Sequence, residues 1–190
     1  MKKHLITSLL YTLVTSLILG LAYPLVVTGI AHVLFPDKAN GQLVYDASGQ
    51  LIGSKLIGQT FSGPGYFHSR PSAAGTGYDA QSSGGSNLGP TSKALGDRVQ
   101  QSVASEAVAG AGAVPIDLVT TSGSGLDPDI TPEAAYYQVS RIAPLRGVSA
   151  DDLRNLVQTH TTPRQFGVLG EPRVNVLELN MALDALHTQR

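Results

Sequence analysis

Residues 5–35 read LITSLLYTLVTSLILGLAYPLVVTGIAHVLF, a run of 31 residues that contains no Asp, Glu, Lys or Arg. At a rise of about 1.5 Å per residue, such a run forms a helix of roughly 46 Å, whereas the hydrocarbon core of a bilayer is only about 30 Å thick. A buried helix of a soluble protein is rarely so long and so free of charge. The sequence therefore predicts one N-terminal transmembrane helix, which occupies residues 1–35 together with a short leading tip.

The charges that flank this run indicate its orientation. Lys2 and Lys3 precede it, whereas Asp37 and Lys38 cancel each other directly after it. Because cytoplasmic flanks carry an excess of Lys and Arg, we expect a cytoplasmic N-terminus and an extracytoplasmic domain over residues 36–190. The chain is then a single-pass protein of the inner (plasma) membrane, in contact with lipid.

A cleaved signal peptide is the main alternative to an uncleaved anchor. The small residues Gly20 and Ala22, or Gly29 and Ala31, could form a cleavage site. The apolar run continues well past the first pair, however, and cleavage after the second requires an unusually long apolar segment. The uncleaved anchor is the favoured interpretation.

Small side chains recur at a four-residue spacing inside the run. In lipid, where the hydrophobic effect does not drive helix association, a face of small residues allows another helix to approach closely. We therefore expect a partner-packing face. Its residues are Ser8, Thr12, Ser16, Gly20 and Thr28. Pro24 lies in the same series and predicts a kink, because proline removes one backbone hydrogen bond.

The remaining 155 residues have the size of one globular domain. Two of the 13 basic residues precede the apolar run and all 14 acidic residues follow it, so this domain carries 11 basic and 14 acidic side chains. Such a mild charge, without a basic patch interleaved with aromatic residues, does not indicate nucleic acid binding. The chain has no cysteine, which excludes disulfides and thiolate sites.

The pattern of the domain predicts an α+β fold of unknown strand order. Thr131 before Pro132 is a typical helix start, and Ser149 with Asp152 resembles a capping box. Apolar spacing indicates the other elements. The expected elements are a hairpin of residues 43–46 and 50–54, helices over 91–109, from 132, from 150 and over 176–186, and a buried strand over 114–121.

Two loops stand out by their composition. Residues 63–90 contain seven glycines and three prolines, but also the anchors Tyr66, Phe67 and Tyr78. Because flexible linkers rarely carry such anchors, we expect an ordered, interface-forming loop. Residues 120–129 form a second Gly-, Ser- and Asp-rich loop. Its N–H groups could bind an anion, although a glycine-dependent turn is the simpler interpretation.

No catalytic or metal-binding motif is present. The sequence lacks a phosphate-binding G-x-x-x-x-G-K-[ST] loop, a complete dinucleotide fingerprint and a G-x-S-x-G elbow, and its five histidines have no metal-ligand spacing. His68 near Arg70 could contact a ligand, and Asp127 with Asp129 could form a carboxylate pair, but a turn is favoured around Pro128. Two alternatives stay open, a free-standing membrane-anchored ligand-binding protein and an anchored hydrolase without a visible motif.

Short motifs are distributed along nearly the whole chain. They are LAYPLVVTG at 21–29, LFP at 34–36, ANG at 39–41, YFHSRPS at 66–72, SSGGSNLGP at 82–90, SGSGLDP at 122–128, VNVLELN at 174–180 and ALD at 182–184. In this order and spacing they resemble the KdpC family, the C subunits of bacterial high-affinity Kdp potassium-transporting P-type ATPases. Asp129 stands where His or Asn is expected in that family, and Ser69 where Gly is common.

The resemblance implies three protein partners. These are a channel-like potassium-binding subunit, a P-type ATPase subunit that hydrolyses ATP through an aspartyl-phosphate, and a small single-helix subunit. This chain lacks both the D-K-T-G phosphorylation motif and a TVGYG filter, so it is expected to be a non-catalytic subunit that anchors, assembles and stabilises the complex. Potassium is then the transported ion, ATP acts through the complex, and no covalent cofactor is expected.

Two molecular roles follow from the resemblance. In one, the subunit is a catalytic chaperone that raises the ATP affinity of the pump subunit, with Gln138 near the nucleotide. A domain outside the cytoplasm cannot meet cytoplasmic ATP, however. In the other role, the domain covers the outer mouth of the channel-like subunit and stabilises the assembly or shapes potassium access, which its mild negative charge does not oppose. The expected loop interface consists of Tyr66, Phe67, His68, Arg70, Asn87 and Asp127.

Overall fold

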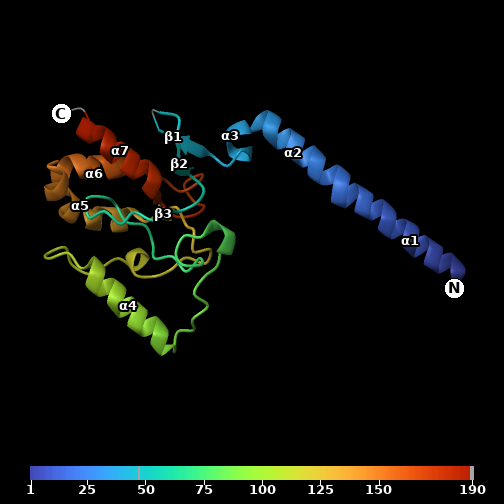
Figure 1. The fold of residues 1–190 in the computed structure, drawn as a ribbon, viewed down its shortest axis with the longest axis horizontal. Coiled ribbons are helices and arrows are strands. Elements are labelled where there is room, and N and C mark those ends of the chain that lie inside the picture. The colour runs from blue at the N-terminus through green and yellow to red at the C-terminus, as the bar shows by residue number, and fades with distance from the viewer. Residues whose placement is uncertain (47, 189–190) are drawn as a thin grey trace. The chain divides into compact units, whose positions relative to one another are not determined.

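The computed structural model describes residues 1–46 and 48–188 of the chain. They form two compact units, Met1–Ile52 and Gly53–Arg190. The first unit is dominated by one long helix, and the second mixes helices with a small sheet (Figure 1). The structure therefore contains the mixture of helix and sheet expected from the sequence.

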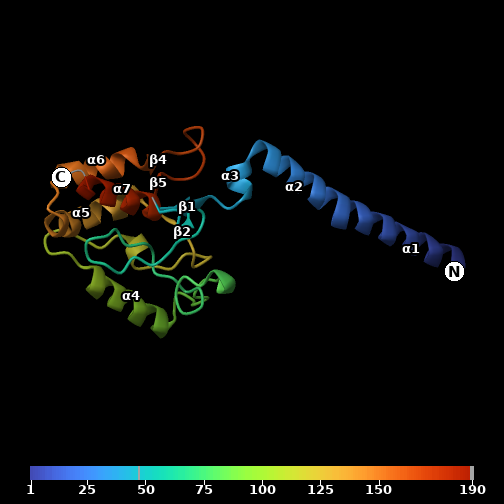
Figure 2. The ribbon, with the colours of Figure 1, turned by 45° about the horizontal axis from the view of Figure 1, so that its top comes forward.

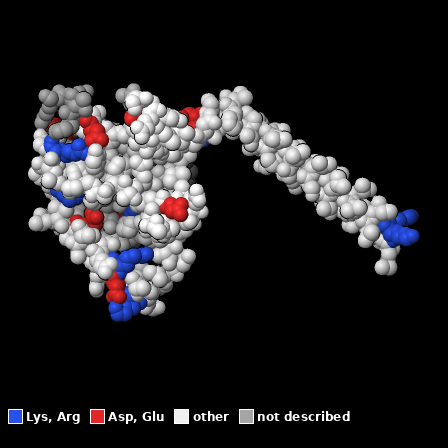
Figure 3. Space-filling view, viewed as in Figure 1, with Lys and Arg blue, Asp and Glu red and all other residues white. Residues whose placement is uncertain are grey.

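The long helix of the first unit consists of α1 (Lys2–Leu17), a π-helical turn (Ile18–Ala22) and α2 (Tyr23–Leu34). Together they form one helix of 33 residues that is long and apolar enough to cross a membrane. In Figure 3 its surface carries charged side chains only at the N-terminal end, where the lysines are blue. A short helix, α3 (Pro36–Ala39), follows it.

The sequence predicts a kink at Pro24, but the helix has no sharp bend there. Within residues 2–34, all of which are described, the helix continues as one rod in both Figure 1 and Figure 2. Pro24 is the second residue of α2, which directly follows the π-helical turn. The wider i→i+5 hydrogen bonding of that turn, such as Tyr23 N–H to Ile18 C=O, accommodates the missing donor.

A β-hairpin follows the helices. Strands β1 (Leu43–Tyr45) and β2 (Leu51–Ser54) pair with each other, as predicted. The Asp46 carboxylate accepts hydrogen bonds from the N–H groups of Ser48 and Gln50, both at 2.8 Å, which fixes the turn. A hydrogen bond from the Ser48 hydroxyl, together with those from the two N–H groups, lowers the pKa of Asp46. Ala47 of the expected loop lies outside the described residues.

The second unit is built mainly from helices. Helices α5, α6 and α7 lie together in Figures 1 and 2, whereas α4 lies at the edge and touches a short 3-10 turn, η3. The predicted helices are confirmed. The elements are η2 (Ala80–Ser82), α4 (Lys93–Glu106), η3 (Ile116–Leu118), α5 (Pro132–Arg146), α6 (Ala150–Thr159) and α7 (Val176–Thr188).

Hydrogen bonds to side chains cap two of these helices where the sequence predicts them. Thr131 Oγ1 accepts the N–H of Ala134 at 3.2 Å at the start of α5. Ser149 Oγ accepts the N–H of Asp152 at 3.0 Å at the start of α6. Each bond satisfies a backbone donor that has no partner within its helix.

A three-stranded antiparallel sheet joins these helices. Its order is β3 (Asp129–Ile130), β5 (Arg173–Asn175) and β4 (Thr161–Thr162), so β5 is central. Ile130 and Thr161 both pair with Val174. Because these strands are only two or three residues long, they show no alternation that sequence analysis could detect.

The strand predicted over residues 114–121 is wrong, because this segment forms η3. Pro115 has no N–H to give to a sheet, and the Ile116 C=O accepts the N–H of Thr120 at 3.0 Å. Asp117 is buried, and its Oδ2 accepts the N–H of Thr131 at 2.8 Å. Within the segment residues 117–119 are buried, whereas Ile116 is exposed, so the segment is a partly buried turn that supports the start of α5.

The core lies between the helices and the sheet. Large side chains from α5, α6 and α7 are completely buried there, namely Ile142, Leu153, Leu179 and Leu183. Phe67, from the glycine-rich loop, is equally buried and belongs to the same cluster. The loop therefore contributes directly to the core, which positions the residues on either side of Phe67.

Candidate functional site

Two buried carboxamides hold the loop 63–90 against the helices. Asn180 of α7 accepts the N–H of Phe67 through Oδ1 at 2.8 Å and donates to its C=O through Nδ2 at 2.9 Å. Gln138 of α5 accepts the N–H of His68 at 2.7 Å and donates to its C=O at 3.2 Å. Each carboxamide thus satisfies a backbone donor and acceptor, as a neighbouring strand would. We call these four residues the carboxamide clamp.

Gln138 uses both polar atoms inside the domain. Besides the His68 backbone, its Oε1 accepts from Arg141 Nη2 at 2.7 Å, and its Nε2 donates to the Ala134 C=O at 3.2 Å. Its side chain is 0% exposed. The structure therefore gives Gln138 a role in ordering the loop, while nucleotide contact stays a prediction.

Phe67 differs from the other residues expected at a loop interface. Its side chain is 0% exposed, so it lies in the core and offers no surface to a partner. The sequence suggested Phe67 both as an anchor that orders the loop and as a member of a loop interface, and its burial fits the ordering role. We expect Phe67 to affect an interface only by fixing the positions of its neighbours.

Tyr66 is fixed at the edge of the domain by α5 and α7. The Arg146 guanidinium carbon lies 4.2 Å from the centre of the Tyr66 ring, a cation–π contact. The Tyr66 hydroxyl donates to Asp184 Oδ2 at 3.2 Å, and Arg146 Nη1 lies 3.0 Å from Asp184 Oδ1. Arg146, Asp184 and Asn180 were given no role from the sequence, because contacts between distant segments leave no local pattern.

His68 connects the loop to the end of α4. Its Nδ1 lies 3.2 Å from Glu106 Oε1, and both side chains are about one-fifth exposed. The hydrogen bond from His68 holds the pKa of Glu106 below its usual value, although burial of the carboxyl group acts in the opposite direction. Glu106 is therefore held in its ionised form.

Arg70 connects the two glycine-rich loops. Its Nη1 lies 3.7 Å from Asp117 Oδ1 and 3.6 Å from Asp127 Oδ2, and its Nη2 donates to Thr120 Oγ1 at 3.3 Å. Asp127 Oδ1 also accepts the N–H of Asp129 at 3.1 Å, which is the turn favoured from the sequence. Burial raises the pKa of Asp129, although Arg173 opposes this shift.

The backbones of the two loops approach closely at Gly125. Ser72 Oγ donates to the Gly125 C=O at 2.6 Å and accepts the N–H of Tyr78 at 2.8 Å. Gly125 has a φ of +67°, and a Cβ there would lie 2.6 Å from the Gly84 carbonyl oxygen. Only glycine fits this position. Burial raises the pKa of Tyr78, whose hydroxyl donates to the Arg70 C=O.

The structure brings Arg70 and Asp127 together, places His68 beside Glu106, and holds Tyr66 against Arg146 and Asp184. Asn87 lies elsewhere in the loop, is exposed and has a left-handed φ of +52°, which asparagine tolerates.

The five residues of the predicted packing face are all exposed on the long helix. In a straight α-helix a four-residue spacing turns by about 40° per step, so Ser8 and Thr28 would be separated by about 200°. The extra residue of the π-helical turn rotates the second part back by about 100°. The π-helical turn therefore keeps the small residues closer to one side of the helix.

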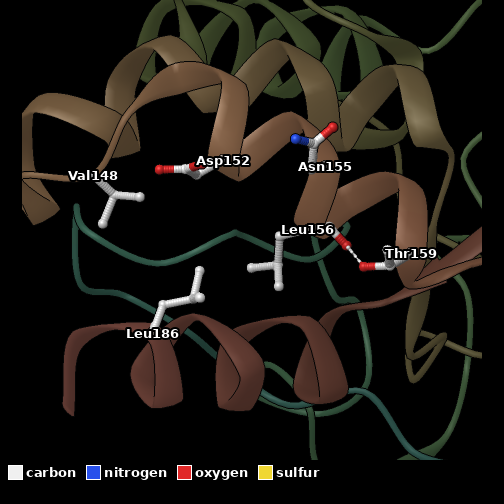
Figure 4. Close-up of a pocket in the computed structure, with 6 residues that line it drawn as sticks. All are labelled: Val148, Asp152, Asn155, Leu156, Thr159 and Leu186. Carbon is white, nitrogen blue, oxygen red and sulfur yellow. Dashed lines mark hydrogen bonds between the residues drawn. The ribbon is translucent and has the colours of Figure 1, made fainter. Parts of the chain in front are cut away.

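Hollows on the described part of the second unit include one of about 350 Å³ that is lined by residues such as Arg70, Asp117 and Asp127. Two more stand out. The first, of about 360 Å³, is lined by polar groups that include His68, Arg70, Tyr78 and Glu106. The second, of about 270 Å³, lies between α6 and α7 and is lined by Val148, Asp152, Asn155, Leu156, Thr159 and Leu186 (Figure 4). Residues 1–46 and 48–188 contain no group of three or more His, Asp or Glu side chains that could hold a metal ion.

Taken together, an N-terminal helix that is long and apolar enough to cross a membrane and a small domain of helices and sheet define a candidate membrane-anchored protein. Comparison with known proteins gives the family. The KdpC family profile, described as "K+-transporting ATPase, c chain", matches residues 5–185. The chain belongs to this family, and is therefore a subunit of a potassium-transporting ATPase complex, in which potassium is the transported ion.

Similar proteins span the same length. The potassium-transporting ATPase KdpC subunit of Acidobacterium capsulatum is 62% identical over 185 residues, which cover 97% of this chain and 100% of that protein. The subunit of the same name from Koribacter versatilis is 60% identical and covers 97% of this chain and 95% of its own. That of Gemmatimonas aurantiaca is 55% identical, with 98% and 94% covered.

Proposed function

We propose that this chain is a non-catalytic subunit that assembles and stabilises the potassium-transporting ATPase from the extracytoplasmic side. The observation that carries this proposal is the carboxamide clamp. It fixes Phe67 and His68, within a loop that has seven glycines and three prolines, through buried hydrogen bonds. A rigid loop loses little conformational entropy when a partner binds, so it suits a permanent protein contact.

The position of the domain follows from its anchor. Lys2 and Lys3 lie at one end of an otherwise charge-free helix of 33 residues. The positive-inside rule supports a cytoplasmic N-terminus, an inner-membrane span and an extracytoplasmic domain. The domain is then a neighbour of the outer mouth of the channel-like subunit, where it stabilises the complex or shapes potassium access.

Two surfaces contact the partners in this proposal. The small residues from Ser8 to Thr28 pack against membrane helices of the channel-like, P-type ATPase or small single-helix subunits. Tyr66, His68, Arg70, Asn87 and Asp127 contribute the loop surface. Phe67 contributes from the core, through the clamp.

The role of a chaperone that raises ATP affinity has less support. It requires that Gln138 reaches a nucleotide, but this carboxamide is fully buried and makes four hydrogen bonds within the domain. It also requires that the domain lies in the cytoplasm, against the charge pattern of the N-terminus. We therefore place this role second to assembly.

Co-purification tests the proposal. The P-type ATPase subunit carries an affinity tag, and the membrane fraction is solubilised in mild detergent. We expect recovery of this chain in constant proportion to the tagged subunit, and loss of the complex from cells that lack the chain. Recovery of the chain alone, with an intact pump, contradicts the proposal and favours the free-standing binding protein.

A further inference from the structure

The β-hairpin that follows the long helix exposes apolar side chains. Leu43 and Tyr45 of β1 are 43% and 53% exposed, whereas Val44 between them is only 9% exposed. Because successive residues of a strand point to opposite sides, Leu43 and Tyr45 lie on one side of β1 and Val44 lies on the other. The strand therefore has a buried side and an exposed apolar side.

The turn of the hairpin brings a third apolar side chain to the exposed side. The N–H of Asp46 donates to the Gln50 C=O at 2.9 Å, which sets these two residues opposite each other in antiparallel pairing. Tyr45 is then opposite Leu51, and directly opposite residues share one side of a sheet. Leu51 is 51% exposed. Leu43, Tyr45 and Leu51 thus form one apolar surface, which we call the hairpin face.

A compact connector holds the hairpin close to the end of the long helix. The N–H of Ala39 donates to the Phe35 C=O at 2.9 Å. The N–H of Gln42, the residue before β1, donates to the Asp37 C=O at 3.0 Å, so the chain winds back on itself. Because successive Cα atoms are about 3.8 Å apart, the Cα atoms of Gln42 and Phe35 lie within roughly 15 Å of each other. The helix and the hairpin face belong to the same compact unit, Met1–Ile52.

The apolar run places this end of the helix at the membrane surface. The run continues to Phe35, and its last residues Val33, Leu34 and Phe35 are 79%, 63% and 57% exposed. A helix of about 46 Å exceeds the hydrocarbon core of about 30 Å, and such a helix keeps its apolar ends out of water by tilting. Phe35 then lies next to the lipid headgroups, and the short connector brings the hairpin face to the same level.

The side chains of the hairpin suit the boundary between acyl chains and headgroups. Tyrosine is enriched at this boundary because its ring is apolar and its hydroxyl group is polar. Asp46 is exposed at the turn, and its charge keeps the turn in water, above the hydrocarbon core. Asp37 and Lys38 of the connector cancel each other, so apolar burial, and not attraction to anionic lipid, accounts for the contact.

We propose that the hairpin face lies in the boundary between acyl chains and headgroups, with phospholipid of the bilayer as its occupant. The proposal depends on the membrane span, which is part of the proposed function, but does not depend on assembly with other subunits. A lipid contact outside the span fixes the depth and tilt of the long helix. It therefore sets the height at which the small residues of this helix meet partner helices.

Tryptophan fluorescence tests the proposal, because the native chain contains no Trp. The full-length Tyr45→Trp variant is reconstituted into phosphatidylcholine vesicles whose acyl chains carry bromine near the headgroups, where bromine quenches Trp on contact. We expect emission to fall about twofold relative to vesicles without bromine. Tyr23→Trp, in α2, is the control within the membrane. Tyr136→Trp, at a position of α5 that is 39% exposed, is the control in water.

The controls decide between the outcomes. Quenching of the Tyr45→Trp and Tyr23→Trp variants, without quenching of Tyr136→Trp, supports the proposal. Quenching of Tyr23→Trp alone, or equal quenching of Tyr45→Trp and Tyr136→Trp, overturns the proposal and leaves the membrane span in place. If Tyr23→Trp is not quenched, the membrane span itself fails and the proposal falls with it.

Photo-crosslinking in the assembled complex separates a lipid occupant from a protein occupant. Tyr45 is replaced by benzoylphenylalanine in the full-length chain, and native membranes are irradiated. We expect adducts with phospholipid, identified by mass spectrometry. A dominant adduct with another subunit assigns the hairpin face to a protein contact and overturns the proposal, as does the absence of any lipid adduct.

Discussion

The Asn180 carboxamide binds both backbone polar groups of Phe67, at 2.8 and 2.9 Å, and both residues are almost completely buried. The Asn180 side chain, on α7, thereby satisfies the backbone of a loop residue 113 positions away, as a neighbouring strand would. The Gln138 carboxamide likewise binds the N–H and C=O groups of His68. The glycine-rich loop is therefore fixed to the core at two successive residues, and this arrangement accounts for the order of its surface.

Asn180→Ala is expected to destabilise the domain by about 3 kcal/mol, because it leaves a buried N–H and C=O of Phe67 without partners. Denaturant unfolding of the full-length chain in detergent measures this loss. The control is Gln101→Ala, at an exposed position of α4, for which we expect a change below about 0.5 kcal/mol. Similar values for the two variants argue against the clamp.

Gln138→Ala separates the structural role from nucleotide contact. Its matched control is Asn180→Ala, which removes the equivalent clamp bond pair at Phe67 and has no proposed nucleotide role. If the clamp alone matters, both variants reduce recovery of the complex by similar factors and leave the KM for ATP of the recovered pump unchanged. A rise in this KM with Gln138→Ala only restores the chaperone role.

Glu106→Gln is expected to lower the free energy of unfolding of the domain at neutral pH, because His68 lowers the pKa of Glu106 in the folded state. A carboxyl group with a lowered folded pKa stabilises the fold above its unfolded pKa, near 4.5, and loses this contribution as the pH falls further. The difference in unfolding free energy between wild type and variant is therefore largest above about pH 5 and shrinks below pH 4.5. If the difference in unfolding free energy between wild type and variant grows as the pH falls, the stabilising contact between His68 and Glu106 is contradicted.

Ser16→Leu combined with Gly20→Leu fills the predicted packing face of the membrane helix. We expect reduced co-purification with the pump subunits, because two added side chains prevent close helix approach. Val14→Phe with Ile18→Phe adds bulk about 160° around the helix and serves as the control. If recovery of the Leu variant is unchanged, or if the Leu and Phe variants lose recovery equally, the predicted packing face is contradicted.

The local features of the fold were predictable from sequence, and the tertiary ones were not. The caps at Thr131 and Ser149 depend on residues three positions apart, so their signals are short and specific. The strands of the small sheet are too short to show a period. The apolar run around Asp117 has the pattern of a strand. The contact that explains its burial as a turn, the hydrogen bond from the Thr131 N–H to Asp117, involves a residue outside the run.

The candidate site shows the same limit. The loop residues from Tyr66 to Arg70 could be singled out by composition and by their resemblance to a family. Their partners could not, since Gln138 and Asn180 lie 70 and 113 positions away from the residues that they bind. Sequence could suggest Phe67 as an anchor that orders the loop, but it could not show that Phe67 belongs to the core.

We propose that the globular domain lies outside the cytoplasm, and labelling of single cysteines tests this placement. The native chain has no cysteine, so Asp151→Cys, at a side chain that is 88% exposed, and Lys3→Cys, at the other end of the membrane helix, give clean signals. We predict that a membrane-impermeant thiol reagent labels the Asp151→Cys variant in intact cells and the Lys3→Cys variant only after lysis. The reverse pattern contradicts the extracytoplasmic placement and puts the domain on the cytoplasmic side, where ATP is bound.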